Sequence, residues 1–135
     1  MERTFAIIKP DAVRAKNAGK IIDRIEQEGF TIVGMKKLQL TAKQAEDFYA
    51  VHKGKPFLPE LVAFMTSGPV VVMVLEKHNA IQAWRDLMGP TNPANAGEVT
   101  LRKLYGTDIG CNATHGSDAP ETAAQEIKFF FPELS

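Results

Sequence analysis

The sequence predicts an α+β sandwich in which a ferredoxin-like βαββαβ order builds a four-stranded antiparallel sheet with extra helices. Short runs of apolar and β-branched residues, typical of strands, alternate along the chain with segments whose apolar residues recur at helical spacing. The 135 residues, 44% hydrophobic and 24% charged, have the size and composition of an ordinary globular domain. We therefore expect one domain over residues 1–135, with the sheet covered mainly on one face.

Two strands and a helix are predicted in the N-terminal part of the chain. Residues 4–8 form an apolar run that ends at a Lys-Pro-Asp turn, which indicates a buried strand. Residues 19–29 carry isoleucines on one side of a predicted helix, and Gly29 stands where such a helix ends. Residues 31–40 are rich in β-branched side chains and predict a second strand, with a bulge at Gly34 where the alternation fails.

A pair of helices, a central strand and another helix follow. Thr41 and Gln44 match a capping box, which begins a helix, and residues 57–65 resume helical spacing after a Lys-Gly-Lys-Pro break. Residues 70–75 are uninterrupted apolar residues and predict a central strand. Residues 79–88 have apolar side chains along one face, which predicts a further helix.

The C-terminal part begins with a predicted long loop. Residues 89–112 show no period and contain Gly-Pro, Asn-Pro and Ala-Gly breaks, and loops of this length in compact domains are usually functional. Thr91 and Arg102 are its candidate phosphate ligands. A short strand then reaches His115, and a proline begins the last helix, which we expect over residues 121–128.

Charge and cysteine content exclude several classes of protein. Lys+Arg and Asp+Glu both number 16, so the formal net charge is zero and no global basic field attracts nucleic acid or an anionic membrane. Cys111 is the single cysteine, which excludes an intramolecular disulfide and a multi-cysteine zinc site. No signal peptide or apolar span of about 18 residues is present, so we expect a cytoplasmic protein without a membrane partner.

The residues around His115 carry the strongest chemical signal. A neutral imidazole is a good nucleophile near pH 7, because its unperturbed pKa is about 6.5. Gly116 lets a bulky group come close, and a helix N-terminus just beyond favours arriving negative charge. Two other interpretations stay open on these residues alone: a core histidine satisfied by a neighbouring carbonyl, and a reactive thiol at Cys111.

Several motifs together resemble the nucleoside diphosphate kinase family. Asn112-Ala113-Thr114-His115-Gly116-Ser117-Asp118 resembles its active-site signature, an asparagine, two variable residues and then His-Gly-Ser-Asp. The resemblance extends over essentially the whole chain, and the other matching positions are Ile8-Lys9-Pro10-Asp11, Tyr49, Pro56-Phe57, Ser67-Gly68-Pro69-Val70, Arg85, residues 89–93 and Arg102.

The resemblance implies transfer of the γ-phosphate of a nucleoside triphosphate, mainly ATP, to nucleoside diphosphates by a ping-pong mechanism. His115 would attack through Nδ1 and become a phosphohistidine. Glu126 would hold the other imidazole nitrogen, and Ser117 would be hydrogen-bonded near the histidine. Tyr49 and Lys9 would lie near the transferred phosphate and the sugar, where Lys9 can neutralise developing charge.

The resemblance also implies how the nucleotide and its metal are held. The expected contacts are a phosphate clamp of Arg85, Thr91 and Arg102, ribose contacts from Lys9 and Asn112, stacking of the base on Phe57, and apolar walls from Leu61 and Ile109. Mg²⁺ is expected on the phosphates without a direct protein ligand, with Asp118 contacting one of its waters. The implied partners are nucleoside di- and triphosphates and other copies of the chain, as a tetramer or a hexamer, with no nucleic acid required.

Two positions depart from common patterns of the family, and two rival functions remain. Cys111 stands where many members carry a polar residue, and Glu98-Val99-Thr100-Leu101 replaces a Pro-Gly-Thr-Ile sequence.

A phosphohistidine carrier in a relay would need an exposed histidine but no nucleotide clamp. A non-catalytic nucleotide-binding protein could lose His115 or Glu126, and this chain has both.

Overall fold

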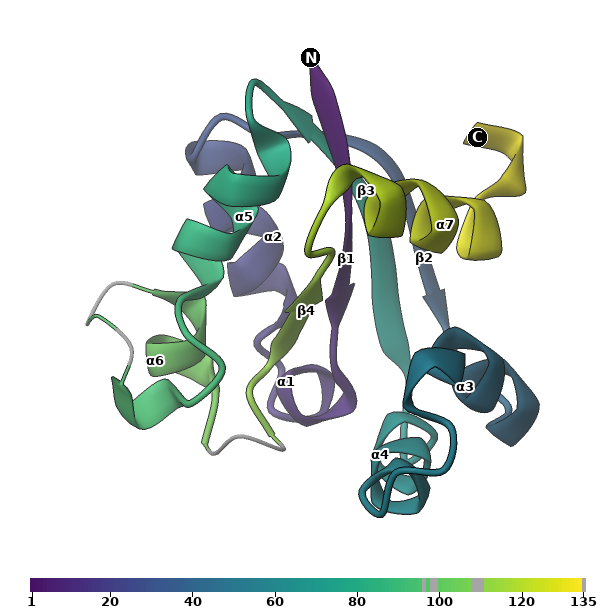
Figure 1. Cartoon of the computed structure of the whole chain (residues 1–135). Helices are drawn as coiled ribbons and strands as arrows, with labels where there is room; N and C mark the ends of the chain where they lie inside the picture. Colours follow the sequence, from purple (N-terminus) through teal and green to yellow (C-terminus); the bar gives the residue numbers. More distant parts are fainter. Residues whose placement is uncertain (96, 98–99, 108–110, 135) are drawn as a thin grey trace.

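A computed structural model describes residues 1–95, 97, 100–107 and 111–134 of the chain. Its strands form one sheet in the order β2-β3-β1-β4, and all neighbouring pairs are antiparallel (Figure 1). The strands are β1 (Glu2–Ile8), β2 (Thr31–Leu38), β3 (Val70–Lys77) and β4 (Thr114–Gly116). The predicted ferredoxin-like fold is confirmed, and the two most apolar runs become the two central strands, β1 and β3.

The described helices cover this sheet; short 3₁₀ turns at Ala50–His52 and Pro93–Asn95 lie between helices, and a third, at Pro132–Leu134, follows the last helix. They are α1 (Pro10–Arg14), α2 (Ala18–Gln27), α3 (Ala42–Phe48), α4 (Leu58–Met65), α5 (Ala80–Met88), α6 (Leu101–Tyr105) and α7 (Pro120–Phe130). Within the described part of the chain, no helix has both the length and the apolar character needed to cross a membrane.

The local signals for helix and strand ends agree with the structure at three places. Thr41 Oγ1 accepts from the Gln44 amide and Gln44 Oε1 accepts from the Thr41 amide, so the predicted capping box is present. Gly29 follows α2 with φ +91°, a conformation that glycine adopts readily. The register of β2 shifts between Ile32 and Gly34, which confirms the predicted bulge.

The prediction of one long loop over residues 89–112 was wrong, because α6 lies inside it. The Thr100 hydroxyl accepts from the Lys103 amide and caps the start of this helix. A helix of five residues is too short to show a hydrophobic period in the sequence. Packing stabilises it instead, since Leu101 is completely buried.

The expectation that helices would cover mainly one face of the sheet was also wrong, because both faces are buried. Phe5 and Ile7 of β1 face a cluster made with α3, α4 and α7, while Ala6 and Ile8 face a cluster made with α2 and α5 (Figure 1). All four side chains are fully buried. A strand buried on both sides needs apolar residues without alternation, which is the pattern that residues 4–8 show.

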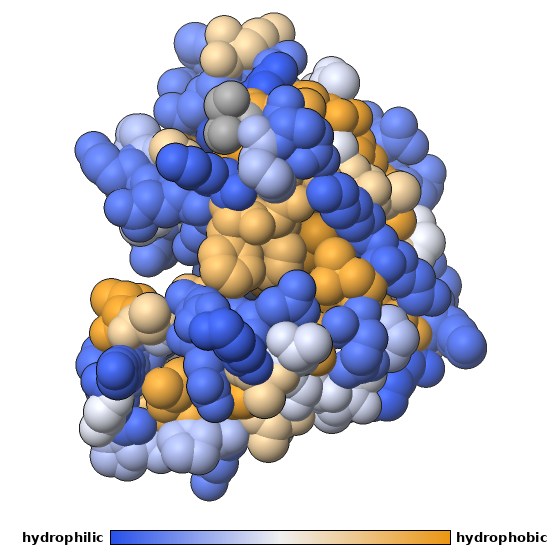
Figure 2. Space-filling view, turned by 90° about the vertical axis from the view of Figure 1, so that its right-hand side faces the viewer, coloured by the Kyte–Doolittle hydropathy of each residue, from blue (hydrophilic) through white to orange (hydrophobic). Residues whose placement is uncertain are grey.

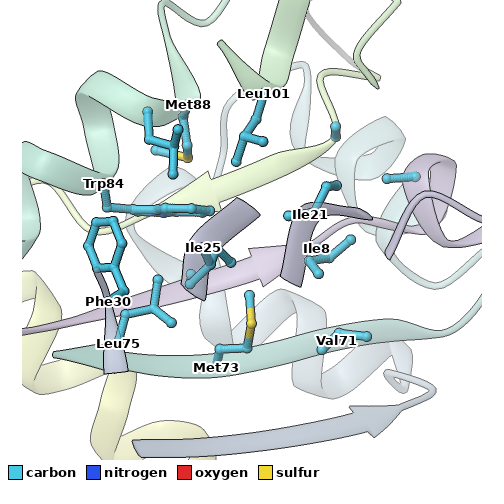
Figure 3. Packing of buried hydrophobic residues seen from close by; sticks show 14 of the residues in the cluster. Ile8, Ile21, Ile25, Phe30, Val71, Met73, Leu75, Trp84, Met88 and Leu101 are labelled. Carbon is cyan, nitrogen blue, oxygen red and sulfur yellow. The ribbon is translucent and has the colours of Figure 1, made fainter. Parts of the chain in front are cut away.

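Trp84 joins the second of these clusters to β4, the strand that carries His115. The indole ring lies between Met88 and Ile25, with Phe30 against its edge at a centroid distance of 6.2 Å (Figure 3). Its Nε1 donates a hydrogen bond to the His115 carbonyl over 3.2 Å. The backbone of His115 is therefore attached to the core that lies behind it.

Candidate active site

His115 lies in β4, opposite Ile7 of β1, and its side chain reaches the face of the sheet covered by α3 and α7. Its ring approaches Phe48 at a centroid distance of 5.6 Å and Tyr49 at 6.4 Å. The side chain remains 21% exposed. The imidazole is thus held among aromatic rings while one edge stays accessible.

The contact with Glu126 determines which nitrogen of this imidazole is free. His115 Nε2 lies 3.0 Å from Glu126 Oε1, and the buried Ser117 donates its hydroxyl to the same oxygen over 2.8 Å. An ionised carboxylate only accepts hydrogen bonds, so it favours the tautomer with the proton on Nε2. Nδ1 then carries the lone pair. The hydrogen-bond partner of this ring is thus a carboxylate, and not a neighbouring carbonyl as the alternative of a core histidine required.

A cavity of about 630 Å³ opens beside His115. Seven of the residues singled out from the sequence line it: Lys9, Arg85, Thr91, Arg102, Asn112, His115 and Asp118. Three of these side chains are cationic and come from segments far apart in the chain, which favours an anionic ligand. Among the described residues, no group of three or more His, Cys, Asp or Glu side chains is placed to hold a metal ion.

Arg102 connects two walls of this cavity. Its Nη1 donates to the Gly89 carbonyl over 2.9 Å and its Nη2 to the Thr114 carbonyl over 3.0 Å. Burial and the charge of Arg85 lower the pKa of Arg102 to about 10, which leaves it charged at neutral pH. Arg85 itself donates to Asp118 Oδ1 over 2.5 Å at the rim. Positive charge therefore lies at the rim of the cavity, on Arg85, and deeper in its lining, on the more buried Arg102.

Lys9 and Asn112 form a polar link in the lining of the same cavity. The Lys9 ammonium donates to Asn112 Oδ1 over 2.8 Å, and Asn112 Nδ2 donates to the Thr91 carbonyl over 3.1 Å. Burial and the charge of Arg102 lower the pKa of Lys9 to about 8. The ammonium is therefore poorly solvated, and an incoming phosphate would stabilise its charge.

Phe57 and Leu61, two of the residues expected to contact the base, do not line this cavity. Phe57 is 46% exposed and reaches His115 through a series of rings: Phe57 to His52 at 5.1 Å, His52 to Tyr49 at 6.2 Å, and Tyr49 to His115. Leu61 packs at the edge of the core. Burial raises the pKa of Tyr49, which keeps its phenol neutral.

His52 lies beside the site although the sequence analysis did not single it out. The side chain is half-buried between two rings of the site, and its Nδ1 has no hydrogen-bond partner among the described residues. One signal could have identified it: His52 comes three residues after Tyr49, and a continuing helix would place both on one face.

Ile109, a predicted wall of the base site, and residues 98–99 of the variant loop lie outside the described residues.

A second cavity of about 430 Å³ lies on the aromatic side of His115, between α3 with its following turn and α7. Phe48, Tyr49, Glu126 and Phe129 line it together with His115. A hollow is visible at the left margin of Figure 2, above the region where Figure 1 places α3 and α4, and apolar side chains gather beside it. His115 therefore stands between two openings in the surface.

Replacing Gly116 with alanine is expected to lower the free energy of unfolding by about 1–3 kcal/mol, because the added methyl overpacks the core. A Cβ at this position would lie 2.5 Å from Trp84 Cδ1 and 2.6 Å from Met88 Cε. Urea denaturation measures the change. Gly19→Ala is the matched control, since no atom lies within 4 Å of its Cβ and we expect equal or higher stability. Equal stability of the two variants would contradict the packing of Trp84 described above.

An imidazole with its Nδ1 free, beside a cavity with three cationic side chains, is an arrangement typical of enzymes of phosphoryl transfer. The family model of nucleoside diphosphate kinase matches residues 2–135. The nucleoside diphosphate kinases of Desulfotalea psychrophila and Syntrophotalea carbinolica are each 63% identical over 134 residues, which cover 99% of this chain and 98% of each relative.

Solved structures agree with these relatives. The nucleoside diphosphate kinase of Aquifex aeolicus has a TM-score of 0.96 at 48% identity, covering 98% of this chain and 96% of that one. A halophilic nucleoside diphosphate kinase from Halobacterium salinarum in complex with CDP has a TM-score of 0.92 at 42% identity, covering 96% of this chain and 87% of that one. The chain belongs to the nucleoside diphosphate kinase family, and the predicted kinase function is confirmed.

Proposed function

We propose that this kinase works by a ping-pong mechanism in which His115 carries the phosphoryl group from one nucleotide to the next. The contact of 3.0 Å between His115 Nε2 and Glu126 Oε1 is the observation that carries the proposal. Because this contact occupies Nε2, it leaves Nδ1 as the nucleophile beside the cationic cavity. The same pocket then serves donor and acceptor in turn, since the two half-reactions are chemically alike.

In the first half-reaction the Nδ1 lone pair of His115 forms a bond to the γ-phosphorus of a nucleoside triphosphate. The bond from that phosphorus to the bridging β–γ oxygen breaks, and the nucleoside diphosphate leaves with the electron pair. The imidazole becomes positively charged, and the carboxylate of Glu126 stabilises this charge through the proton on Nε2. A second nucleoside diphosphate attacks the phosphohistidine in the reverse sense and leaves as the triphosphate.

The cationic side chains of the cavity supply the electrostatic part of this mechanism. Arg85 and Arg102, together with Thr91, would clamp the phosphates. Lys9 would neutralise charge that develops on the transferred group, and Lys9 and Asn112 would hold the ribose hydroxyls. The neutral phenol of Tyr49 stands beside the imidazole, where it can donate to a phosphate oxygen.

The base would stack on the exposed ring of Phe57, with Leu61 and Ile109 as apolar walls. Stacking does not read the hydrogen-bonding edge of a base, so we propose that purine and pyrimidine nucleotides, mainly ATP as donor, are all accepted. The solved relative from Halobacterium salinarum holds CDP, a pyrimidine diphosphate, which supports this breadth.

Magnesium fits the chemistry of this site as a partner of the nucleotide. Asp118 lines the cavity with a side chain that is 78% exposed, so its carboxylate is placed to accept from a magnesium-bound water. When bound, Mg²⁺ neutralises phosphate charge.

We further propose that the chain acts as one domain over residues 1–135 in the cytoplasm. The family resemblance implies a homo-oligomer, either a tetramer or a hexamer.

A two-step transfer tests this function. The protein is incubated with γ-labelled ATP and Mg²⁺, freed of nucleotide, and then given unlabelled GDP. We expect acid-labile, base-stable label on the protein, its release as GTP, and loss of labelling when EDTA removes the metal. Label that ignores GDP would identify a relay carrier instead, and bound ATP without label would identify a non-catalytic binding protein.

A further inference from the structure

The backbone turns sharply two residues before His115, at Ala113. This alanine has φ +73°, and the Thr114 amide donates to the Asn112 carbonyl over 2.9 Å, which closes a three-residue γ-turn. Residues other than glycine rarely adopt this conformation, and they keep it only where the surroundings enforce it. Ala113 and Thr114 are fully buried and Asn112 nearly so, so the turn is part of the packed interior.

The segment that follows β1 holds this turn on both sides. The Lys9 amide donates to the Ala113 carbonyl over 2.8 Å. The Ala113 amide donates in turn to the Asp11 carboxylate over 3.1 Å, through Oδ2. Both polar groups of the strained peptide are therefore bound by residues about a hundred positions earlier in the chain, and the mechanism above gives Asp11 no role.

We propose that Asp11 is a positioning residue for phosphoryl transfer: its carboxylate holds the strained turn at Ala113 and so fixes the direction in which β4 presents the His115 imidazole. Asn112, on the other side of the turn, is positioned by the same contact. This inference rests on the proposed role of His115 as the nucleophile.

The environment of Asp11 agrees with a carboxylate that is kept for this contact. Its Oδ1 is buried and has no hydrogen-bond partner among the described residues, so solvation does not explain why an acid stands here. Burial raises the pKa of Asp11, while the amides of Ala113, Ala12 and Asp11 and the charge of Lys9 act in the opposite direction. Among the described residues, the hydrogen bond from the Ala113 amide therefore links this side chain to a distant segment of the chain.

The test compares three variants by the single-turnover rate of His115 phosphorylation from labelled ATP and by the dissociation constant of the nucleotide. We expect Asp11→Ala to slow phosphorylation by about 10- to 100-fold, since a misplacement of about 1 Å can have an effect of this size. We expect Asp11→Asn, which keeps an acceptor oxygen, to stay within about threefold of wild type. Asp23→Ala, at an exposed position of α2, is the control for loss of an aspartate.

A double variant separates positioning from a general loss of structure. Ala113→Gly removes the strain because glycine adopts positive φ readily, so Asp11→Ala with Ala113→Gly should recover a large part of the lost rate. An effect of Asp11→Ala that Ala113→Gly does not reduce, or an equal loss in Asp11→Asn, would overturn the proposal. A wild-type chain that forms no phosphohistidine would refute the proposed function, whereas an unimpaired Asp11→Ala chain would refute this inference alone.

Discussion

Replacing His115 with alanine is expected to reduce phosphoryl exchange by at least about four orders of magnitude while nucleotide binding survives. The variant loses the atom that we propose forms the covalent intermediate, and no other described side chain occupies the same position between Glu126 and the cationic cavity. The residues expected to hold the phosphates and the base lie on other segments of the chain. Their contacts with the nucleotide therefore persist.

Coupled exchange assays and calorimetric titration with ADP measure the two quantities separately. His78→Ala is the matched control, since this histidine is exposed in the turn after β3 and has no place in the site. Loss of binding together with exchange would show that His115 is mainly structural. Label that still forms on the His115→Ala chain would show that another residue is the nucleophile.

Replacing Glu126 with alanine is expected to slow His115 phosphorylation by about 10²- to 10⁴-fold, equivalent to about 3–5 kcal/mol of activation free energy. Without the carboxylate, the imidazole proton can move to Nδ1, which removes the nucleophilic lone pair. The positive charge that develops on the ring also loses its partner at 3.0 Å. The affinity for nucleotide should change little, because Glu126 does not line the cationic cavity.

Single-turnover labelling measures this rate, and ¹⁵N NMR of the imidazole reports the tautomer directly. Glu121→Ala is the matched control, because this glutamate is exposed in the first turn of the same helix. A spectrum that keeps the proton on Nε2 together with a wild-type rate would contradict the assigned role of Glu126. A slower rate with an unchanged tautomer would restrict that role to charge stabilisation.

Local sequence patterns determined the elements whose physical cause is local. The apolar run of β1 predicted a buried strand and that of β3 a central one, because burial on both faces removes the alternation. Thr41 and Gln44 predicted the start of α3, because a capping box involves residues only three apart. The residues around His115 identified the family, because their types and spacing suffice for a motif.

The tertiary structure decided the features that depend on residues distant in sequence. Helix α6 and the coverage of the second face of the sheet arise from packing, and short or strongly apolar segments do not encode either in a period. Lys9 meets Asn112 across 103 positions because β1 and β4 pair side by side. The Asp11 contact with Ala113 has the same origin.

The sequence by itself thus determined the order of the four strands and of the helices other than α1 and α6, the histidine proposed as nucleophile, and the family. The structure decided which charges surround that histidine, which of its nitrogens is bound, and what holds the turn before it. The reason is physical. The preference of most segments for helix or strand is set by near neighbours in the chain, whereas a site is formed by side chains that approach one another only when the sheet has assembled.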